Sequence, residues 1–273
     1  MQSSKVREPV VAGQFYPASE RSLRSQIESL IDKKTEKFDA IGCMLPHAGY
    51  PYSGKVAAET VSSINIKKNI ILLGPNHTGY GSAFSIMTEG IWKTPLGEVK
   101  INSALAKAML SGSKYLEEDY LAHAYEHSLE VELPFLQYFS TDFEIVPITF
   151  MSQDINALKC VGKEIAEAVN LLKIKGSVLI VASSDMTHYE PQEEALKKDK
   201  EAIKAILELN EDKLMKETAR LDITMCGSAP TAVMLSAAKS LGANNAKLIK
   251  YQTSGDVTND KDSVVGYAGI VVY

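Results

Sequence analysis

The stretch NIILLGPNHTGYG (residues 69–81) combines two signals that recur along the chain. Its first six residues form a mostly apolar, branched run, which is typical of a strand buried on both faces of a parallel sheet. Pro75 then stops the strand, and His77 follows in a turn that contains glycine. Ligands of parallel sheets bind beyond the carboxyl ends of the strands. The position of His77 therefore indicates a ligand site.

Five further apolar runs have the same character. They are short, rich in branched residues and bounded by Gly, Pro or polar residues, and they span residues 41–45, 143–150, 177–184, 246–252 and 264–273. Helical patterns lie between most of them, at residues 19–33, 154–173, 191–209 and 228–242, and residues 84–102 have the pattern of an extended hairpin. This alternation predicts an α/β fold with a mostly parallel central sheet and helices on both faces. Because the last two strands follow each other closely, we expect a mixed sheet. We expect residues 1–273 to form a single domain.

Composition limits the classes of function. Hydrophobic residues make up 45% of the 273 residues, which is enough for a substantial core, and the formal net charge is −5. An acidic chain without a block of Lys and Arg does not favour nucleic-acid binding. The apolar runs fall short of the ~20 residues that span a bilayer, and the first residues do not resemble a signal peptide. Three scattered cysteines do not suggest a disulfide framework. These features predict a reduced, cytoplasmic protein without a membrane partner.

Two more strand ends carry groups that can do chemistry. The stretch MLPHAGYPYSG (44–54) places His47 after one apolar run, followed by an expected glycine-rich turn. The stretch SVLIVASSDMTHYE (177–190) places Asp185 and His188 after another. An acid beside an imidazole orients the ring and raises its basicity. This pair is therefore a candidate general base or metal ligand.

Cys226 is the fourth element of the candidate site. It precedes the helix expected from Ser228, and the positive end of a helix dipole lowers the pKa of a thiol. Thiolates bind zinc, copper(I) and iron strongly. With His47 and His77, Cys226 would form a three-ligand site with an open position, which is typical of catalytic metals. Taken singly, a histidine in a loop or a lone cysteine more often has an ordinary structural role.

The segment HAYEHSLEVELPFLQYF (123–139) needs a separate interpretation. Its two histidines are spaced i, i+4, but the glutamate that a zincin motif requires after the first histidine is absent. We expect an amphipathic helix over most of the segment, with its leucines facing the core. His127 or Glu130 would then reach the edge of the site.

Six motifs, taken in this order, resemble the Memo family. They are VAGQFYP (11–17), PHAGYPYSG (46–54), GPNHTGYG (74–81), EHSLEVELPFLQ (126–137), SSDMTHY (183–189) and CGSAP (226–230). The resemblance extends over nearly the whole chain. It implies a fold similar to that of class III extradiol dioxygenases, which are non-haem iron enzymes that open catechol rings.

The resemblance also implies roles for the candidate residues. By motif, His47 and His77 match the two metal-site histidines of the family, and Cys226 matches its cysteine. Asp185 and His188 match the acidic and basic residues of the pocket, and the related dioxygenases use a histidine at the place of His188 as acid and base. Those dioxygenases hold Fe(II) with two histidines and a glutamate, whose place Cys226 takes here. Ring cleavage therefore does not follow from the fold.

Three functions remain open on this basis. We expect a metal-dependent redox or oxygenase-like enzyme that acts on a small substrate, with Fe(II), copper or zinc as its cofactor. His188, oriented by Asp185, would move protons. Tyr50, Tyr52, Tyr189 and His127 would line the pocket. The alternatives are a non-catalytic protein that binds a peptide or small ligand in this pocket, and a zinc-dependent hydrolase. The sequence leaves the oligomeric state open.

Overall fold

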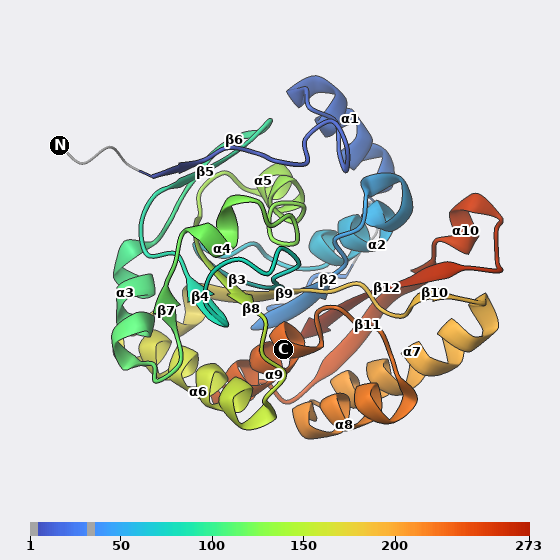
Figure 1. Cartoon of the computed structure of the whole chain (residues 1–273). Helices are drawn as coiled ribbons and strands as arrows, with labels where there is room; N and C mark the ends of the chain where they lie inside the picture. Colours follow the sequence, from blue (N-terminus) through green and yellow to red (C-terminus); the bar gives the residue numbers. More distant parts are fainter. Residues whose placement is uncertain (1–4, 32–35) are drawn as a thin grey trace.

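A nine-stranded mixed sheet runs through the middle of the computed structural model, which describes residues 5–31 and 36–273 (Figure 1). The strands lie in the order β10-β12-β2-β9-β3-β8-β4-β7, and β11 pairs with β12. Their bounds are β2 (Gly42–Leu45), β3 (Asn69–Pro75), β4 (Phe84–Ile86), β7 (Glu117–Glu118), β8 (Glu144–Phe150), β9 (Val178–Ser183), β10 (His188–Glu190), β11 (Ala246–Thr253) and β12 (Val264–Val272). A smaller sheet joins β1 (Val6–Arg7), β5 (Ile91–Thr94) and β6 (Gly97–Lys100).

The centre of the large sheet is parallel. Strands β2 and β3 both pair in parallel with β9, and β3 also pairs in parallel with β8. At the flanks, β12 is antiparallel to β2, and β4 is antiparallel to β8. The mixed α/β fold that the sequence predicts is confirmed. Because β2, β9 and β3 run side by side in one direction, their carboxyl ends meet at one edge.

Helices cover both faces of this sheet. They are α1 (Glu20–Leu30), α2 (Tyr50–Ser62), α3 (Ser103–Gly112), α4 (Leu121–Ala124), α5 (Leu133–Phe139), α6 (Ile155–Leu171), α7 (Gln192–Leu207), α8 (Glu211–Leu221), α9 (Ser228–Ser240) and α10 (Gly255–Thr258), with a 3-10 turn at Lys175–Ser177. Helix α2 contacts β2, β11 and β12, whereas α9 contacts β2, β3, β8 and β9. Figure 1 shows α1, α2 and α5 above the sheet and α6 to α9 below it.

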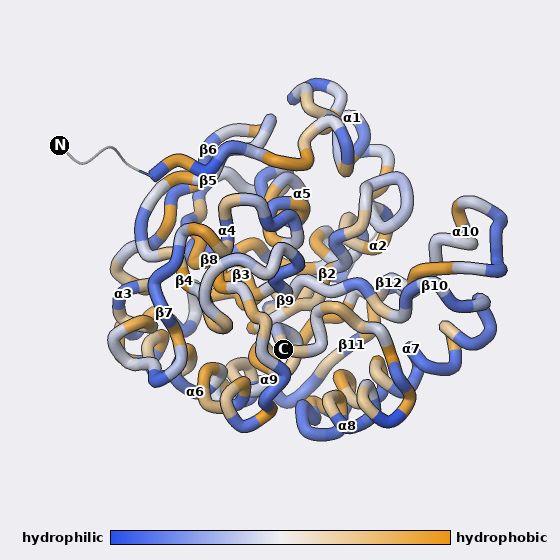
Figure 2. The backbone as a smooth tube through the Cα atoms, in the orientation of Figure 1, coloured by the Kyte–Doolittle hydropathy of each residue, from blue (hydrophilic) through white to orange (hydrophobic). Residues whose placement is uncertain are grey.

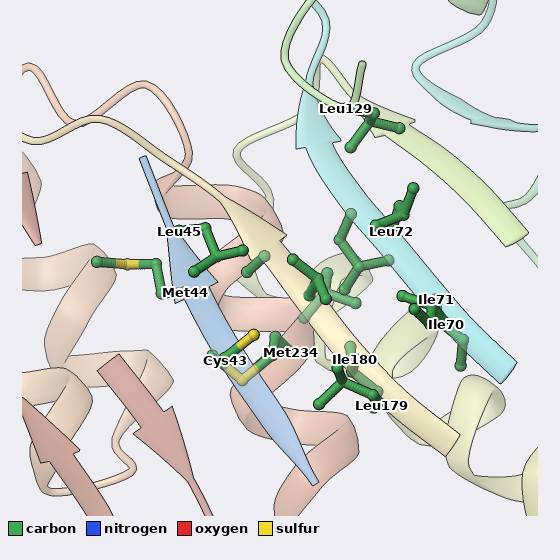
Figure 3. Close-up of a cluster of buried hydrophobic side chains, with 14 of the residues drawn as sticks. Cys43, Met44, Leu45, Ile70, Ile71, Leu72, Leu129, Leu179, Ile180 and Met234 are labelled. Carbon is green, nitrogen blue, oxygen red and sulfur yellow. The ribbon is translucent and has the colours of Figure 1, made fainter. Parts of the chain in front are cut away.

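The apolar runs form the core between these layers. Ile70, Ile71 and Leu72 of β3 are fully buried, and Met234 of α9 packs among the central strands (Figure 3). Hydrophobic residues concentrate in the middle of the fold, and hydrophilic residues dominate the outer surfaces of α7 and α8 (Figure 2). Burial of apolar side chains, at about 25 cal/mol per Å² of buried area, thus holds the strands in place.

Several local predictions are wrong in detail. The glycine-rich turn expected after His47 is instead the first turn of α2. Pro51 fits there, because a backbone N–H at the start of a helix has no partner within the helix. The segment 123–139 is not one helix, because helix α5 begins only at Leu133. The hairpin expected over residues 84–102 is formed by β5 and β6, while β4 joins the large sheet. Helices α3 and α8 were not expected from the sequence.

Other predicted boundaries are close. Asp154 caps α6 with its side chain, and α9 begins at Ser228, as predicted, with Gly227 in the cap position. The last residues of the helix expected over 19–33 lie outside the described residues. Within the described part of the chain, no helix combines the length and the apolar character needed to cross a bilayer.

Candidate metal and proton-transfer site

Three neighbouring strand ends deliver the candidate site. His47 follows β2, His77 follows β3 and Asp185 follows β9, so all three lie at the same edge of the sheet. Cys226 comes from the loop before α9. A Cβ on its neighbour Gly227 would collide with the end of β9, so only a glycine lets this loop approach the edge so closely. Chain segments far apart in sequence therefore meet at one point.

His47, His77 and Cys226 form a compact set of candidate metal donors. Each offers one ligand atom, and these atoms all lie within 4.8 Å of one another. Nε2 of His47 lies 3.3 Å from Sγ of Cys226, and the centroids of the two imidazole rings are 5.3 Å apart. The structure thus brings together the three residues that the sequence proposes as ligands.

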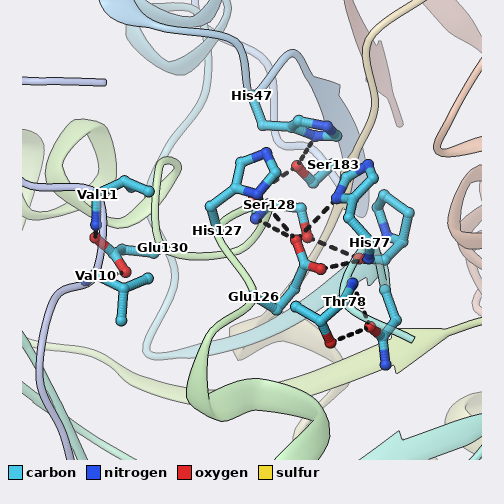
Figure 4. Close-up of polar contacts among 12 residues, drawn as sticks. Val10, Val11, His47, His77, Thr78, Glu126, His127, Ser128, Glu130 and Ser183 are labelled. Carbon is cyan, nitrogen blue, oxygen red and sulfur yellow. Dashed lines mark hydrogen bonds and ion pairs between the residues drawn. The ribbon is translucent and has the colours of Figure 1, made fainter. Parts of the chain in front are cut away.

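The second nitrogen of each histidine is tied to a neighbouring side chain. Nδ1 of His47 lies 2.8 Å from the hydroxyl of Ser183, and Nδ1 of His77 lies 2.9 Å from a carboxylate oxygen of Glu126 (Figure 4). In metal sites, a partner on one ring nitrogen orients the ring and leaves the other nitrogen for the metal. Both histidines have this arrangement, and both leave Nε2 for the ligand role.

Glu126 also organises a third histidine. Nδ1 of His127 lies 3.4 Å from the same carboxylate oxygen, and its ring stacks on that of His77 at 4.8 Å. Burial disfavours ionisation of Glu126, but hydrogen bonds from His77 and from the backbone of Ser128 outweigh burial and lower its pKa to about 2. His77, Glu126 and His127 form a second possible metal-binding group. Because both carboxylate oxygens already accept backbone N–H groups, we assign Glu126 the role of orienting the two imidazoles.

Burial sets the protonation state of the candidate metal donors. The pKa of His47 lies well below its usual value, first because the ring is buried and then because His77 and His127 are close. Its lone pair is therefore available to a cation. The expected low pKa of Cys226 is wrong for the metal-free protein, because burial and the charge of Asp185 raise the pKa of its thiol. A bound cation would reverse this balance by stabilising the thiolate.

His188 is oriented by Thr224 and not by Asp185. Nδ1 of His188 lies 2.9 Å from the carbonyl oxygen of Thr224, and its backbone N–H donates to the Thr224 hydroxyl at 2.7 Å. Oδ1 of Asp185 instead accepts the backbone N–H groups of His47 and Ala48, at 2.9 and 3.3 Å. Burial raises the pKa of Asp185 to about 6, although His188 and these two hydrogen bonds lower it in part. The charge of His188 thus favours the ionised form of Asp185.

The histidines of the site and Asp185 surround a cavity of about 220 Å³, whereas Cys226 is not part of its lining. Its lining consists of Phe15, His47, Ala48, Gly49, His77, His127, Asp185, His188, Tyr189, Val265 and Tyr267. Tyr189 lies at the mouth, where 78% of the residue is exposed, with a left-handed backbone (φ 57°) that is uncommon for a bulky residue. A larger cavity of about 560 Å³ beside α8 contains neither a histidine nor a cysteine, so we place the chemistry in the smaller one.

Two expected lining residues lie elsewhere. Tyr50 is buried beside the site, where its hydroxyl donates to the carbonyl of Val131 and its ring stacks on Phe135. Tyr52 projects from the first turn of α2 and does not line the cavity. Tyr50 and Tyr52 do not line the cavity because they lie in the first turn of α2, where the side chains of successive residues point in different directions.

Several contributors were missed. Phe15 belongs to a quoted motif, and Glu126 stands next to His127, so both had a signal in the sequence. Tyr267 lies within an apolar strand and had none. Glu130, expected as an alternative to His127, is buried away from the cavity in an ion pair with Arg7.

Comparisons with known proteins identify the family of the chain. The family described as Memo-like protein matches residues 7–271. A MEMO1 family protein of Methanopyrus kandleri is 41% identical over 97% of this chain and 98% of its own. One of Methanococcoides burtonii is 45% identical over 98% of this chain and 100% of its own. An uncharacterized protein of Escherichia coli K12 shares the fold, with a TM-score of 0.56 and 13% identity over 84% of this chain and 98% of its own. The chain belongs to the Memo family.

Proposed function

We propose that this Memo-family protein binds a metal ion through His47, His77 and Cys226 and uses it in redox or oxygenase-like chemistry on a small substrate. The observation that supports the proposal is the convergence of three ligand atoms, within 4.8 Å, from three separate segments. The donor set suits iron, copper or zinc, because it combines two imidazoles with a soft sulfur. A redox-active ion bound there would supply electron transfer with the substrate or oxygen.

The remaining residues would bind the substrate and move protons. Since Nδ1 of His188 is held by the carbonyl of Thr224, its Nε2 is free to accept or return a proton inside the cavity. Phe15 and Tyr267 provide aromatic walls, and the exposed Tyr189 lies at the mouth. A cavity of about 220 Å³ accepts only a small molecule or the end of a larger one.

Metal analysis and titration test the proposal. The protein is purified without chelators or metal-affinity resin, its metals are quantified, and the metal-free form is titrated with Fe(II), copper(I) and zinc. Alanine at His47, His77 or Cys226 should lower affinity by orders of magnitude, because a three-ligand site loses a ligand. Cys160→Ala is the matched control, since this thiol lies on α6 and bonds to Glu164 outside the site. Unchanged affinity of Cys226→Ala would refute the ligand set.

Turnover assays then separate the classes of function. Oxygen-dependent turnover with iron or copper supports the redox assignment. Turnover with zinc under nitrogen supports a hydrolase instead. Peptide binding that persists after metal removal, without turnover, supports a binding protein.

A further inference from the structure

Glu132 is a fully buried carboxyl group for which the proposed function has no use. It lies in the turn before α5, with 0% of its surface exposed. One oxygen, Oε1, lies 2.8 Å from the hydroxyl of Ser183. The other, Oε2, is buried and has no hydrogen-bond partner among the described residues. The strongest charge acting on Glu132 is that of Asp185, which has the same sign as a carboxylate.

An ionised carboxylate in these surroundings is unfavourable. Burying a charge without a partner costs so much that the group normally becomes neutral instead. Burial raises the pKa of Glu132 well above its usual value; the hydrogen bond with Ser183 lowers it in part, and the charge of Asp185 raises it again. The environment therefore favours a proton on Glu132.

Hydrogen-bond geometry at Ser183 leads to the same assignment independently. Its Oγ has three partners at 2.8 Å: Nδ1 of His47, the carbonyl oxygen of Ser128 and Oε1 of Glu132 (Figure 4 shows the first two). A hydroxyl donates one hydrogen and accepts two. The carbonyl can only accept, so it takes the hydroxyl hydrogen. The other two partners must then donate.

An ionised Glu132 would leave a buried polar group without a hydrogen bond. With Glu132 ionised, its carboxylate and the Ser128 carbonyl would compete for the single hydrogen of Ser183. One buried acceptor would lose, at a cost of about 1–3 kcal/mol. With Glu132 protonated, every contact of the Ser183 hydroxyl is a hydrogen bond, and His47 carries its hydrogen on Nδ1.

We propose that Glu132 is a neutral carboxylic acid that acts through Ser183 to hold His47 in the tautomer whose Nε2 faces Cys226. Glu132 and Ser183 are positioning residues for His47. The consequence for metal affinity rests on the proposed function, whereas the proton on Glu132 and the tautomer of His47 do not.

Two measurements on the metal-free protein test this assignment. Infrared spectra at neutral pH should contain the carbonyl band of a protonated carboxyl group that Glu132→Gln lacks. Imidazole nitrogen chemical shifts should show His47 protonated at Nδ1, and Ser183→Ala should produce a mixture of tautomers. Absence of the infrared difference, or a hydrogen on Nε2 of His47 in the unaltered protein, would overturn the proposal.

Zinc titration measures the effect on the metal site. Ser183→Ala should bind zinc about 10–100-fold more weakly, which is typical of losing the partner of a ligating histidine. Glu132→Gln should stay within about twofold, because its amide N–H replaces the acid proton. Equal losses in both variants would show that Glu132 acts as a carboxylate and would refute the proposal. If the unaltered protein binds no zinc, iron or copper, the proposed function fails, and the spectra still decide the state of Glu132.

Discussion

The ion pair between Arg7 and Glu130 joins the N-terminal segment to the segment that carries Glu126. Nη1 of Arg7 lies 2.8 Å from Glu130, and both side chains are at most 1% exposed. The same guanidinium donates to the carbonyl of Glu126 at 2.5 Å. Glu130 also accepts from two backbone N–H groups and from the hydroxyl of Tyr16. Removing this carboxylate would leave a buried cation and several donors without partners.

The expected loss follows from this burial. Breaking a buried pair by removing one partner costs about 3–5 kcal/mol, because the other charge stays uncompensated. At about 2.1 cal/mol/K per residue, 273 residues have an unfolding entropy of about 0.57 kcal/mol/K. Glu130→Leu should therefore lower the melting temperature by about 5–9 °C. It should also weaken metal binding, because Arg7, which donates to the carbonyl of Glu126, loses its charge partner.

Chemical and thermal denaturation check this prediction. Glu8→Gln is the matched control, since it removes the exposed pair between Glu8 and Lys93 from the same N-terminal segment. Exposed pairs contribute little, so the control should melt like the parent protein. The double variant Arg7→Met with Glu130→Leu should recover part of the loss, because it leaves no unpaired charge. Equal shifts for Glu8→Gln and Glu130→Leu would refute the reasoning.

Three further predictions concern the site and its surroundings. His188→Ala should keep the metal but lower turnover on any substrate found by about 10²-fold or more, as loss of a general base does; loss of the metal would place His188 among the ligands. Burial, and then the charge of Arg7, lowers the pKa of His123 to about 4 in the folded protein. The unfolded chain therefore takes up a proton on His123 at a higher pH than the folded protein does. As a result, the free energy of unfolding falls as the pH drops from about 6.5 to 4. In His123→Phe, up to ~3 kcal/mol of this loss should disappear, as measured by denaturation at several pH values, and zinc affinity should not change. Parallel pH profiles of the free energy of unfolding in the parent protein and the variant would contradict the prediction. Metal at 100 times its dissociation constant should stabilise the parent protein by about 2.7 kcal/mol, and calorimetric scans of Cys226→Ala should show no such gain.

Much of the architecture could be predicted from local patterns. The runs at residues 69–74 and 177–184 form β3 and β9, because short apolar stretches rich in branched residues favour strands buried on both faces. Strand–helix alternation then forces parallel neighbours, which places the ends of β2, β3 and β9 together. The positions of His47 and His77 at one edge therefore followed from the sequence.

Sequence patterns did not predict the structure where hydrogen bonds of buried polar groups outweigh the local preference for a helix. The segment 123–139 has helical spacing, yet Glu126, Glu130 and Glu132 are all buried in it. Each bonds to a partner distant in sequence: His77, Arg7 and Ser183, respectively. These bonds break the helix into turns, and no short window of sequence contains both partners.

The sequence by itself determined the fold class, the family and the segments that supply the candidate metal donors. Each depends on residue type, on short local patterns and on the order of those patterns along the chain. Only the tertiary structure decided how those donors are prepared: which nitrogen of each histidine is free, and that Thr224 rather than Asp185 orients His188. Protonation states and hydrogen-bond partners depend on burial and on distances of about 3 Å between segments up to 179 positions apart. Chain folding alone sets those distances.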